Sequence, residues 1–121
     1  MTSFARAFMS CSNLQSIPDE LFDYNIKVTK FNSTFNSCSN LQTIPVGLFD
    51  KCTKVTNFDF TFDNCGALTG ETPYTLIDGV KIHLYERANY PEYFTAPTSN
   101  SYCFRFCSKL TDYSTIPSGW K

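Results

Sequence analysis

The residues of this chain that could do chemistry are six cysteines and a single histidine. A cysteine nucleophile needs a histidine within hydrogen-bond reach, but His83 lies in an alternating segment whose polar side is expected to face water. Zinc sites use closely spaced ligand pairs, and the chain has no Cys-x-x-Cys. Cys103, Cys107 and His83 are a possible trio, yet Cys107 fits better as a core residue. The sequence predicts no catalytic, metal or cofactor site, and no enzyme.

Four of the cysteines occupy one repeated position: Cys11, Cys38, Cys65 and Cys107. Equivalent residues of stacked units lie roughly 4.8 Å apart with parallel side chains, whereas a disulfide needs converging Cβ atoms about 3.5 to 4.5 Å apart. Because an unpaired cysteine behaves as a small apolar residue, the spacing predicts a column of buried free thiols. The state of Cys52 and Cys103, which lie outside this column, stays open.

A 27-residue repeat explains most of the apolar residues. The repeated positions are Phe4, Phe31 and Phe58; Phe8, Phe35 and Phe62; and Leu14, Leu41 and Leu68. Two full units cover residues 2–28 and 29–55, and a third begins at residue 56 and loses the pattern after residue 68. A fixed period of this length is typical of a solenoid, in which each unit packs only on its neighbours.

Each unit is expected to contain short strands and helical turns. In the second unit, apolar residues at i, i+4 and i+7 predict a short α or 3-10 segment over 31–38. A strand over 41–44 should end at Pro45, because proline cannot donate to a continuing ladder. A helical turn over 45–50 and a second strand over 55–58 complete the unit.

The whole chain, 1–121, is expected to form a single domain. Residues 2–68 are the regular repeats, 69–101 an insert with a β-hairpin and a loop, and 102–121 a degenerate terminal repeat. The Asp78-Gly79 pair between two β-rich runs is a strong signal for the hairpin turn. The insert and the terminal repeat together should cap the last unit, as repeat arrays require.

The unit Phe-x-x-x-Phe-x-x-Cys-x-x-Leu-x-x-Ile-Pro-x-x-Leu-Phe resembles the BspA-like leucine-rich repeats of gut and oral bacteria and their phages. The resemblance covers residues 2–68 and recurs in 102–120. It implies an α/β fold: a right-handed leucine-rich-repeat-like solenoid, displayed outside the cell, that serves in adhesion or protein recognition and has no catalytic centre. The chain departs from the family in its few repeats and in the absence of a secretion signal.

The charge balance and the predicted surface residues limit which classes of partner the chain is expected to bind. With 10 basic and 11 acidic residues the chain shows no footprint for nucleic acid, and its apolar stretches are too short to insert into a membrane. A protein or a surface glycan is therefore the expected partner. The candidate binding residues are Lys81, His83, Tyr85, Arg87, Tyr90 and Tyr93 near the hairpin, and the repeated Gln15 and Gln42.

The first unit begins without a polar capping segment. Its apolar residues, namely Phe4, Phe8, Leu14 and Leu21, are expected at an open edge. Two explanations stay open: the chain is a fragment of a longer repeat array, or this edge joins two copies in a homo-oligomer. We therefore expect a non-catalytic module for protein recognition or adhesion at a bacterial or phage surface. The alternative is a structural, self-associating component of a virion or a cell-surface assembly. Either function implies an extracellular, cell-surface or virion location.

Overall fold

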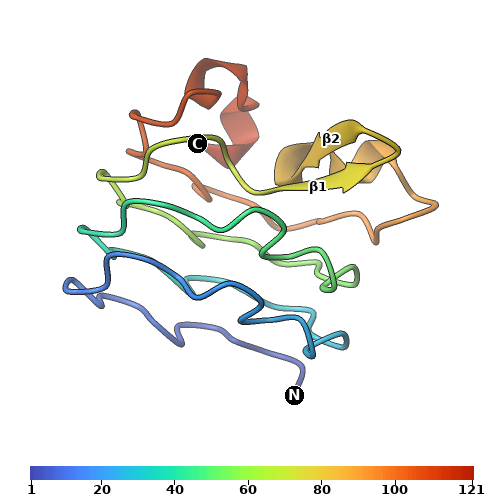
Figure 1. The fold of residues 1–121 in the computed structure, drawn as a ribbon, viewed down its shortest axis with the longest axis horizontal. Coiled ribbons are helices and arrows are strands. Elements are labelled where there is room, and N and C mark those ends of the chain that lie inside the picture. Colours follow the sequence, from blue (N-terminus) through green and yellow to red (C-terminus); the bar gives the residue numbers. More distant parts are fainter.

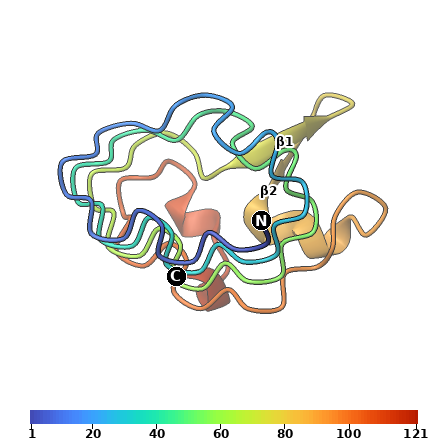
Figure 2. The same cartoon turned by 90° about the horizontal axis from the view of Figure 1, so that it is seen from below.

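The computed structural model describes residues 1–121 as a stack of four layers of chain (Figure 1). We call residues 2–28 layer 1, 29–55 layer 2, 56–98 layer 3 and 99–121 layer 4. Isolated parallel bridges join Ser3 to Lys30, Lys30 to Asn57, and Asn57 to Ser99. Seen along the stack, the layers follow nearly the same outline (Figure 2). The N-terminus lies at one end of the stack and the C-terminal segment at the other.

Regular secondary structure occurs only in the last two layers. The elements are β1 (Tyr74–Ile77), β2 (Val80–His83), η1 (Leu84–Asn89), η2 (Tyr113–Thr115) and η3 (Ser118–Trp120), where η marks a 3-10 helix. β1 and β2 pair antiparallel. Asp78 and Gly79, with φ of 50° and 80°, form the turn between them, which confirms the hairpin predicted there. No helix is long and apolar enough to cross a membrane.

The predicted α/β leucine-rich-repeat-like solenoid is wrong. The chain has one two-stranded antiparallel sheet and three 3-10 helices, all after residue 73. The helical segment expected over 31–38, the strands over 41–44 and 55–58, and the helical turn over 45–50 are turns and irregular chain. No strand or helix therefore recurs with the 27-residue period.

Left-handed residues explain why the helix predicted over 31–38 does not form. Ser33 and Ser37 have φ of 57° and 62°, a region that a right-handed helix cannot contain. The same conformation recurs at Arg6, Ser10, Phe60, Asn64, Tyr102 and Phe106. It turns the chain every fourth residue, so the i, i+4 spacing of the phenylalanines reflects these turns.

A hydrogen-bonded ladder replaces the expected strands. In layer 1 every second N–H, from Phe4 to Ser10, donates to a carbonyl of layer 2 over 2.7 to 3.0 Å. The same four bonds recur from layer 2 to layer 3 and from layer 3 to layer 4. The intervening N–H groups bond within their own turns, as Ala7 does to the Phe4 carbonyl over 3.1 Å. Because all the donors point toward the C-terminal end of the stack, we call this the one-way ladder.

The core is a set of stacked aromatic columns. Phe8, Phe35, Phe62 and Phe104 lie over one another with ring centroids 5.4 to 5.6 Å apart and planes within 8°. All but Phe8, which is half-buried, are at most 1% exposed. Stacked aromatic pairs contribute roughly 0.5 to 1.5 kcal/mol beyond the burial of their area, so these columns are a principal source of stability.

The predicted column of buried thiols is present for three of its four members, and the prediction is wrong for Cys11. Cys38, Cys65 and Cys107 are fully buried, and each thiol lies 3.0 to 3.1 Å from a phenylalanine carbonyl of the preceding layer. Cys11, in layer 1, is exposed. Cys52 and Cys103, outside the column, are also buried and free. Burial raises the pKa of the Cys107 thiol to about 12 and also raises the pKa of Cys38 and Cys65, so these three thiols are unreactive.

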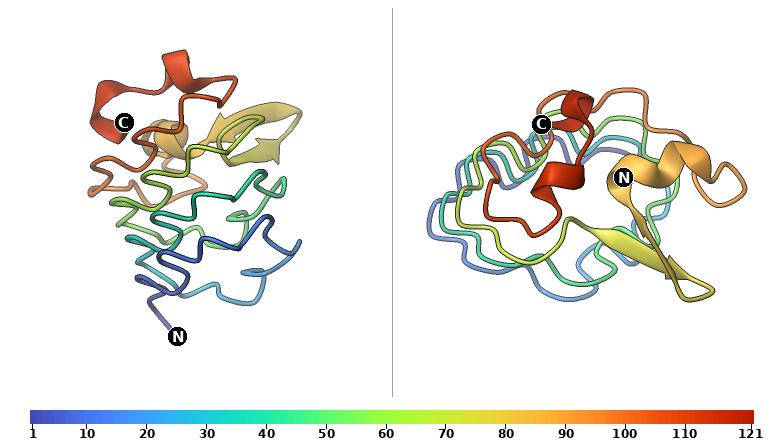
Figure 3. Two further views of the ribbon diagram at one scale, coloured as in Figure 1. Left: turned by 90° about the vertical axis from the view of Figure 1, so that its left-hand side faces the viewer. Right: turned by 90° about the horizontal axis from the view of Figure 1, so that it is seen from above.

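The two ends of the stack differ. At Gly70, where φ is 76°, the chain leaves the stack toward the hairpin. At the C-terminal end, η2 and η3 lie across layer 4 (Figure 3), and the Trp120 carbonyl accepts the Phe104 N–H over 2.8 Å. Trp120 is 7% exposed, so the chain itself closes this end.

Candidate binding surfaces

The predicted hairpin patch is not one exposed surface. Arg87 was expected to be exposed, but it is 1% exposed and donates to the carbonyls of Cys52 (2.8 Å) and Phe49 (3.0 Å). Its guanidinium lies 4.3 Å from the centroid of the Phe94 ring. Burial lowers the pKa of Arg87 to about 10. Arg87 therefore fastens η1 to layer 2 and is not available to a partner.

His83 lies among three carboxylates. Its Nδ1 is 2.8 Å from Glu86, and its Nε2 is 3.3 Å from Glu71 and 3.8 Å from Asp112. The side chain is 13% exposed and its ring stacks on Tyr85 at 5.3 Å. The cluster links β2, η1 and the C-terminal segment. It contains no nucleophile, and the chain has no group of three or more side chains that could hold a metal.

The other predicted residues near the hairpin lie in different surroundings. The Tyr85 hydroxyl donates to Asp112 over 3.1 Å, and burial raises the pKa of this tyrosine. Lys81 is exposed and pairs with Glu71 over 2.7 Å. The two tyrosines of the loop, Tyr90 and Tyr93, are half-buried and exposed. The exposed members could still meet a partner, and that role stays a prediction.

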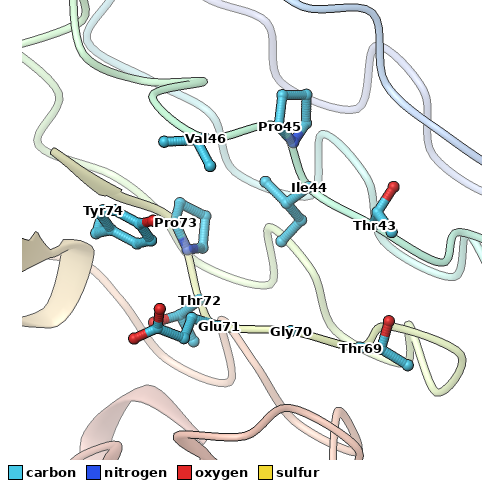
Figure 4. A pocket seen from close by; sticks show the side chains of 10 residues that line it. All are labelled: Thr43, Ile44, Pro45, Val46, Thr69, Gly70, Glu71, Thr72, Pro73 and Tyr74. Carbon is cyan, nitrogen blue, oxygen red and sulfur yellow. The ribbon is translucent and has the colours of Figure 1, made fainter.

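The repeated glutamines lie next to each other on layers 1 and 2. Gln15 and Gln42 are exposed, and the Gln42 N–H donates to the Gln15 carbonyl over 2.9 Å. Beyond them, the departure of layer 3 at Gly70 opens a hollow of about 210 Å³ (Figure 4). Ile44 and Pro45 form one wall and residues 69–74 the other. The hollow is half open, and nothing in it resembles a catalytic arrangement.

A surface that the sequence did not predict lies on layers 3 and 4. We call Phe60, Tyr102, Arg105 and Phe106 the aromatic surface. Phe106 and Tyr102 are 61% and 45% exposed, and the rings of Tyr102 and Phe60 are 5.6 Å apart. The Arg105 guanidinium lies 4.3 Å from the Tyr102 ring and 5.2 Å from the Phe106 ring. Tyrosine, phenylalanine and arginine are enriched where proteins meet.

The aromatic surface is held in place at a cost in backbone strain. Phe60, Tyr102 and Phe106 have φ of 56°, 56° and 67°, a region that is rare for bulky residues. The equivalent positions of other layers carry small or polar residues, for example Ser33 and Asn64. Strained conformations cluster at functional sites. The signal in the sequence was a repeated position that changes from serine or asparagine to an exposed aromatic.

The N-terminal end of the stack is a second uncovered surface. Phe4, Phe8, Leu14 and Leu21 pack on the core and are only half-buried. An apolar hollow of about 210 Å³ is lined by Phe8, Leu14 and Leu21 together with Ile17. Three of the four residues predicted to form an open edge are thus brought together, and Phe4 lies outside this hollow. Whether two copies associate through them stays a prediction.

The geometry is a stack of hydrogen-bonded layers with exposed aromatic residues on one side and a half-buried apolar end. No protein-family profile matches the chain, and no curated protein sequence is significantly similar to it.

Proposed function

We propose that this chain is a non-catalytic module that recognises a protein partner through the aromatic surface. The supporting observation is that Phe60, Tyr102 and Phe106 are all held in a left-handed conformation, and that two of them are largely exposed. Such strain persists only where the surroundings over-determine it. Since burying an exposed aromatic ring is a major source of binding energy, recognition of a partner accounts for the arrangement.

Arg105 gives the aromatic surface a fixed shape. Its Nε and a terminal guanidinium nitrogen bind the two carboxylate oxygens of Asp63 over 2.9 and 2.8 Å. The ion pair holds the guanidinium beside Tyr102 and Phe106, so the partner need not order these side chains itself. Preorganised contacts lose less entropy on binding. We place this recognition or adhesion at a bacterial or phage surface, the setting implied by the resemblance of the repeat.

Matched substitutions test the proposal. Tyr102→Ser and Phe106→Asn introduce residues that the same positions carry in other layers, as Ser33 and Asn64 show, so the fold should tolerate them. Protein binders are selected from a display library against the unmodified chain, and their Kd values are measured by calorimetry. The double substitution should raise Kd at least about tenfold, while Val46→Ala, on an exposed residue elsewhere, should leave it unchanged.

Two results would count against the proposal. If both substitutions leave the Kd of the selected binders unchanged, the aromatic surface is not the surface that protein binders contact. Binding on a glycan array that is lost with the same substitutions, when no protein binder depends on them, would assign the surface to a glycan.

A further inference from the structure

The N-terminal end of the stack presents a row of free hydrogen-bond acceptors. No donor of the chain reaches the carbonyls of Ser3, Ala5, Ala7 and Met9. These four residues are exposed. Their equivalents in layers 2, 3 and 4 each accept an N–H of the preceding layer. The row is therefore the unfilled acceptor side of the one-way ladder.

The equivalent rows of acceptors in layers 2, 3 and 4 show how such a row is covered within the chain. Each time it is a segment whose alternate N–H groups donate to the four carbonyls. In the first two cases its two phenylalanines stack on the two below, and in the third only Phe62 does so, on Phe104. Layer 1 covers layer 2 in this way, with Phe4 on Phe31 at 5.7 Å and Phe8 on Phe35 at 5.5 Å. The outer sides of Phe4 and Phe8 have no such covering, and the apolar hollow lies beside Phe8.

We propose that layer 1 binds a Phe-x-x-x-Phe segment of another polypeptide, which lies across it as layer 1 lies across layer 2. The segment would donate N–H groups to the four free carbonyls and stack its two rings on Phe4 and Phe8. This surface lies at the end of the stack and is distinct from the aromatic surface. The two surfaces share no residue.

The polarity of the ladder selects a foreign segment over a second copy of layer 1. Two copies joined face to face would set one row of carbonyls against the other, and no donor would lie between the rows. On layer 4, the Phe104 N–H already donates to the Trp120 carbonyl over 2.8 Å, and the Trp120 ring stacks on the Phe104 ring at 6.4 Å. A second copy therefore cannot stack its layer 1 on layer 4 as layer 1 stacks on layer 2. A segment with free N–H groups at alternate residues satisfies the row.

Side chains of the interior layers indicate how the contact could be strengthened. The Thr34 hydroxyl lies 2.9 Å from the Phe4 carbonyl of the covering layer, and the Cys38 thiol lies 3.1 Å from the Phe8 carbonyl. In layer 1 the equivalent of Thr34 is Ala7, which has no hydroxyl, and the equivalent of Cys38 is the exposed Cys11. Ala7→Thr should therefore add a donor to a bound segment.

The probe is a fluorescent peptide with the sequence of residues 29–41 carrying Cys38→Ser, titrated into the full chain and followed by anisotropy. We expect saturable binding that tightens roughly two- to tenfold with Ala7→Thr, the gain typical of one added hydrogen bond. A peptide N-methylated at the residues equivalent to Phe31, Ser33 and Phe35 should bind at least about tenfold more weakly. Leu76→Ala, on the exposed hairpin, should leave the affinity unchanged.

Cys11 supplies a second readout. It is the one exposed thiol of the chain, and a bound segment should slow its alkylation, measured by mass spectrometry. The proposal is overturned if the peptide and its N-methylated form bind equally, or if neither binds and Cys11 remains reactive. Dimerisation of the chain alone that protects Cys11 and excludes the peptide would overturn it in favour of self-association.

Discussion

Arg105 of layer 4 donates two hydrogen bonds, of 2.9 and 2.8 Å, to the carboxylate of Asp63 in layer 3. Asp63 is 4% exposed, and its hydrogen bonds and charge raise the pKa of Arg105. Paired geometry of this kind fixes both position and orientation. The ion pair therefore connects the interior of the stack to the aromatic surface. It fixes the position of the Arg105 guanidinium, against which the rings of Tyr102 and Phe106 pack.

Phe106→Asn should make the chain more stable. The side chain is 61% exposed and has φ of 67°, so little burial is lost and the left-handed strain is relieved. We expect the free energy of unfolding to rise by about 1 kcal/mol, measured by urea denaturation. As a contrast, Phe104→Ala, at a fully buried position, should lower it by about 3 to 5 kcal/mol. Equal losses for both would show that Phe106 contributes as core.

Thr61→Val tests the hydroxyl contacts between layers. The Thr61 hydroxyl lies 3.1 Å from the Phe31 carbonyl and 2.7 Å from the Phe58 carbonyl, and the side chain is fully buried. Valine keeps the volume and removes the donor, so we expect a loss of about 1 kcal/mol. Thermal unfolding measures it, and Thr111→Val, at an exposed threonine, serves as the control. A loss as small as that of the control would contradict the assigned role.

Arg87→Ala should destabilise the chain by roughly 3 kcal/mol or more, because it empties a buried site and removes two donors. Arg87→Met, which fills the same volume without a charge, should cost less, since burying an unpaired charge is itself unfavourable. Chemical denaturation of both variants provides the comparison. If Arg87→Ala lowered the free energy of unfolding no more than Arg87→Met, packing at this site would not contribute to stability.

Alkaline pH should unfold the chain through its buried thiols. Burial raises the pKa of Cys52 to about 11 and of Cys107 to about 12, and it also raises the pKa of Cys38, Cys65 and Cys103. Their folded pKa values lie above the ordinary value of 9.0, so the stability they provide is complete below pH 9. It is lost as the pH rises, by about 1.4 kcal/mol per pH unit for each thiol.

Thermal unfolding between pH 7 and 10.5 measures this loss. Cys52→Ala should lower the stability at pH 7 and flatten its decline above pH 9, because one group no longer ionises on unfolding. A melting temperature that stays constant up to pH 10.5 would contradict the prediction.

The part of the fold that the sequence predicted was set by local chemistry or by strict spacing. The Asp78-Gly79 turn needs no distant partner, and the structure places both residues at positive φ. The column of Cys38, Cys65 and Cys107 follows from the period alone. Equivalent positions of stacked layers lie over one another whatever secondary structure each layer adopts. The period was thus a reliable guide to which residues share an environment.

The secondary structure within each layer could not be read from the same pattern. Serine and phenylalanine give no sign that Ser33 and Phe60 adopt left-handed φ, and phenylalanines four residues apart are equally typical of a helix. The competing arrangement is stabilised by bonds to residues 26 positions later, and no local propensity records these bonds. Burial of Arg87 likewise depends on carbonyls 35 and 38 residues away.

The one-way ladder also has an electrostatic consequence. Each peptide group carries a dipole of about 3.5 D, and dipoles aligned in a row add, as they do along a helix. The donors of residues 4, 6, 8 and 10 and their equivalents all point the same way, whereas bonds on the other side of the layers, such as Gln42 N–H to Gln15 and Thr69 N–H to Gln42, point the opposite way. The partial negative charge is therefore local to the carbonyls of Ser3 to Met9, where a cation or a chain's amino end is favoured over a carboxylate.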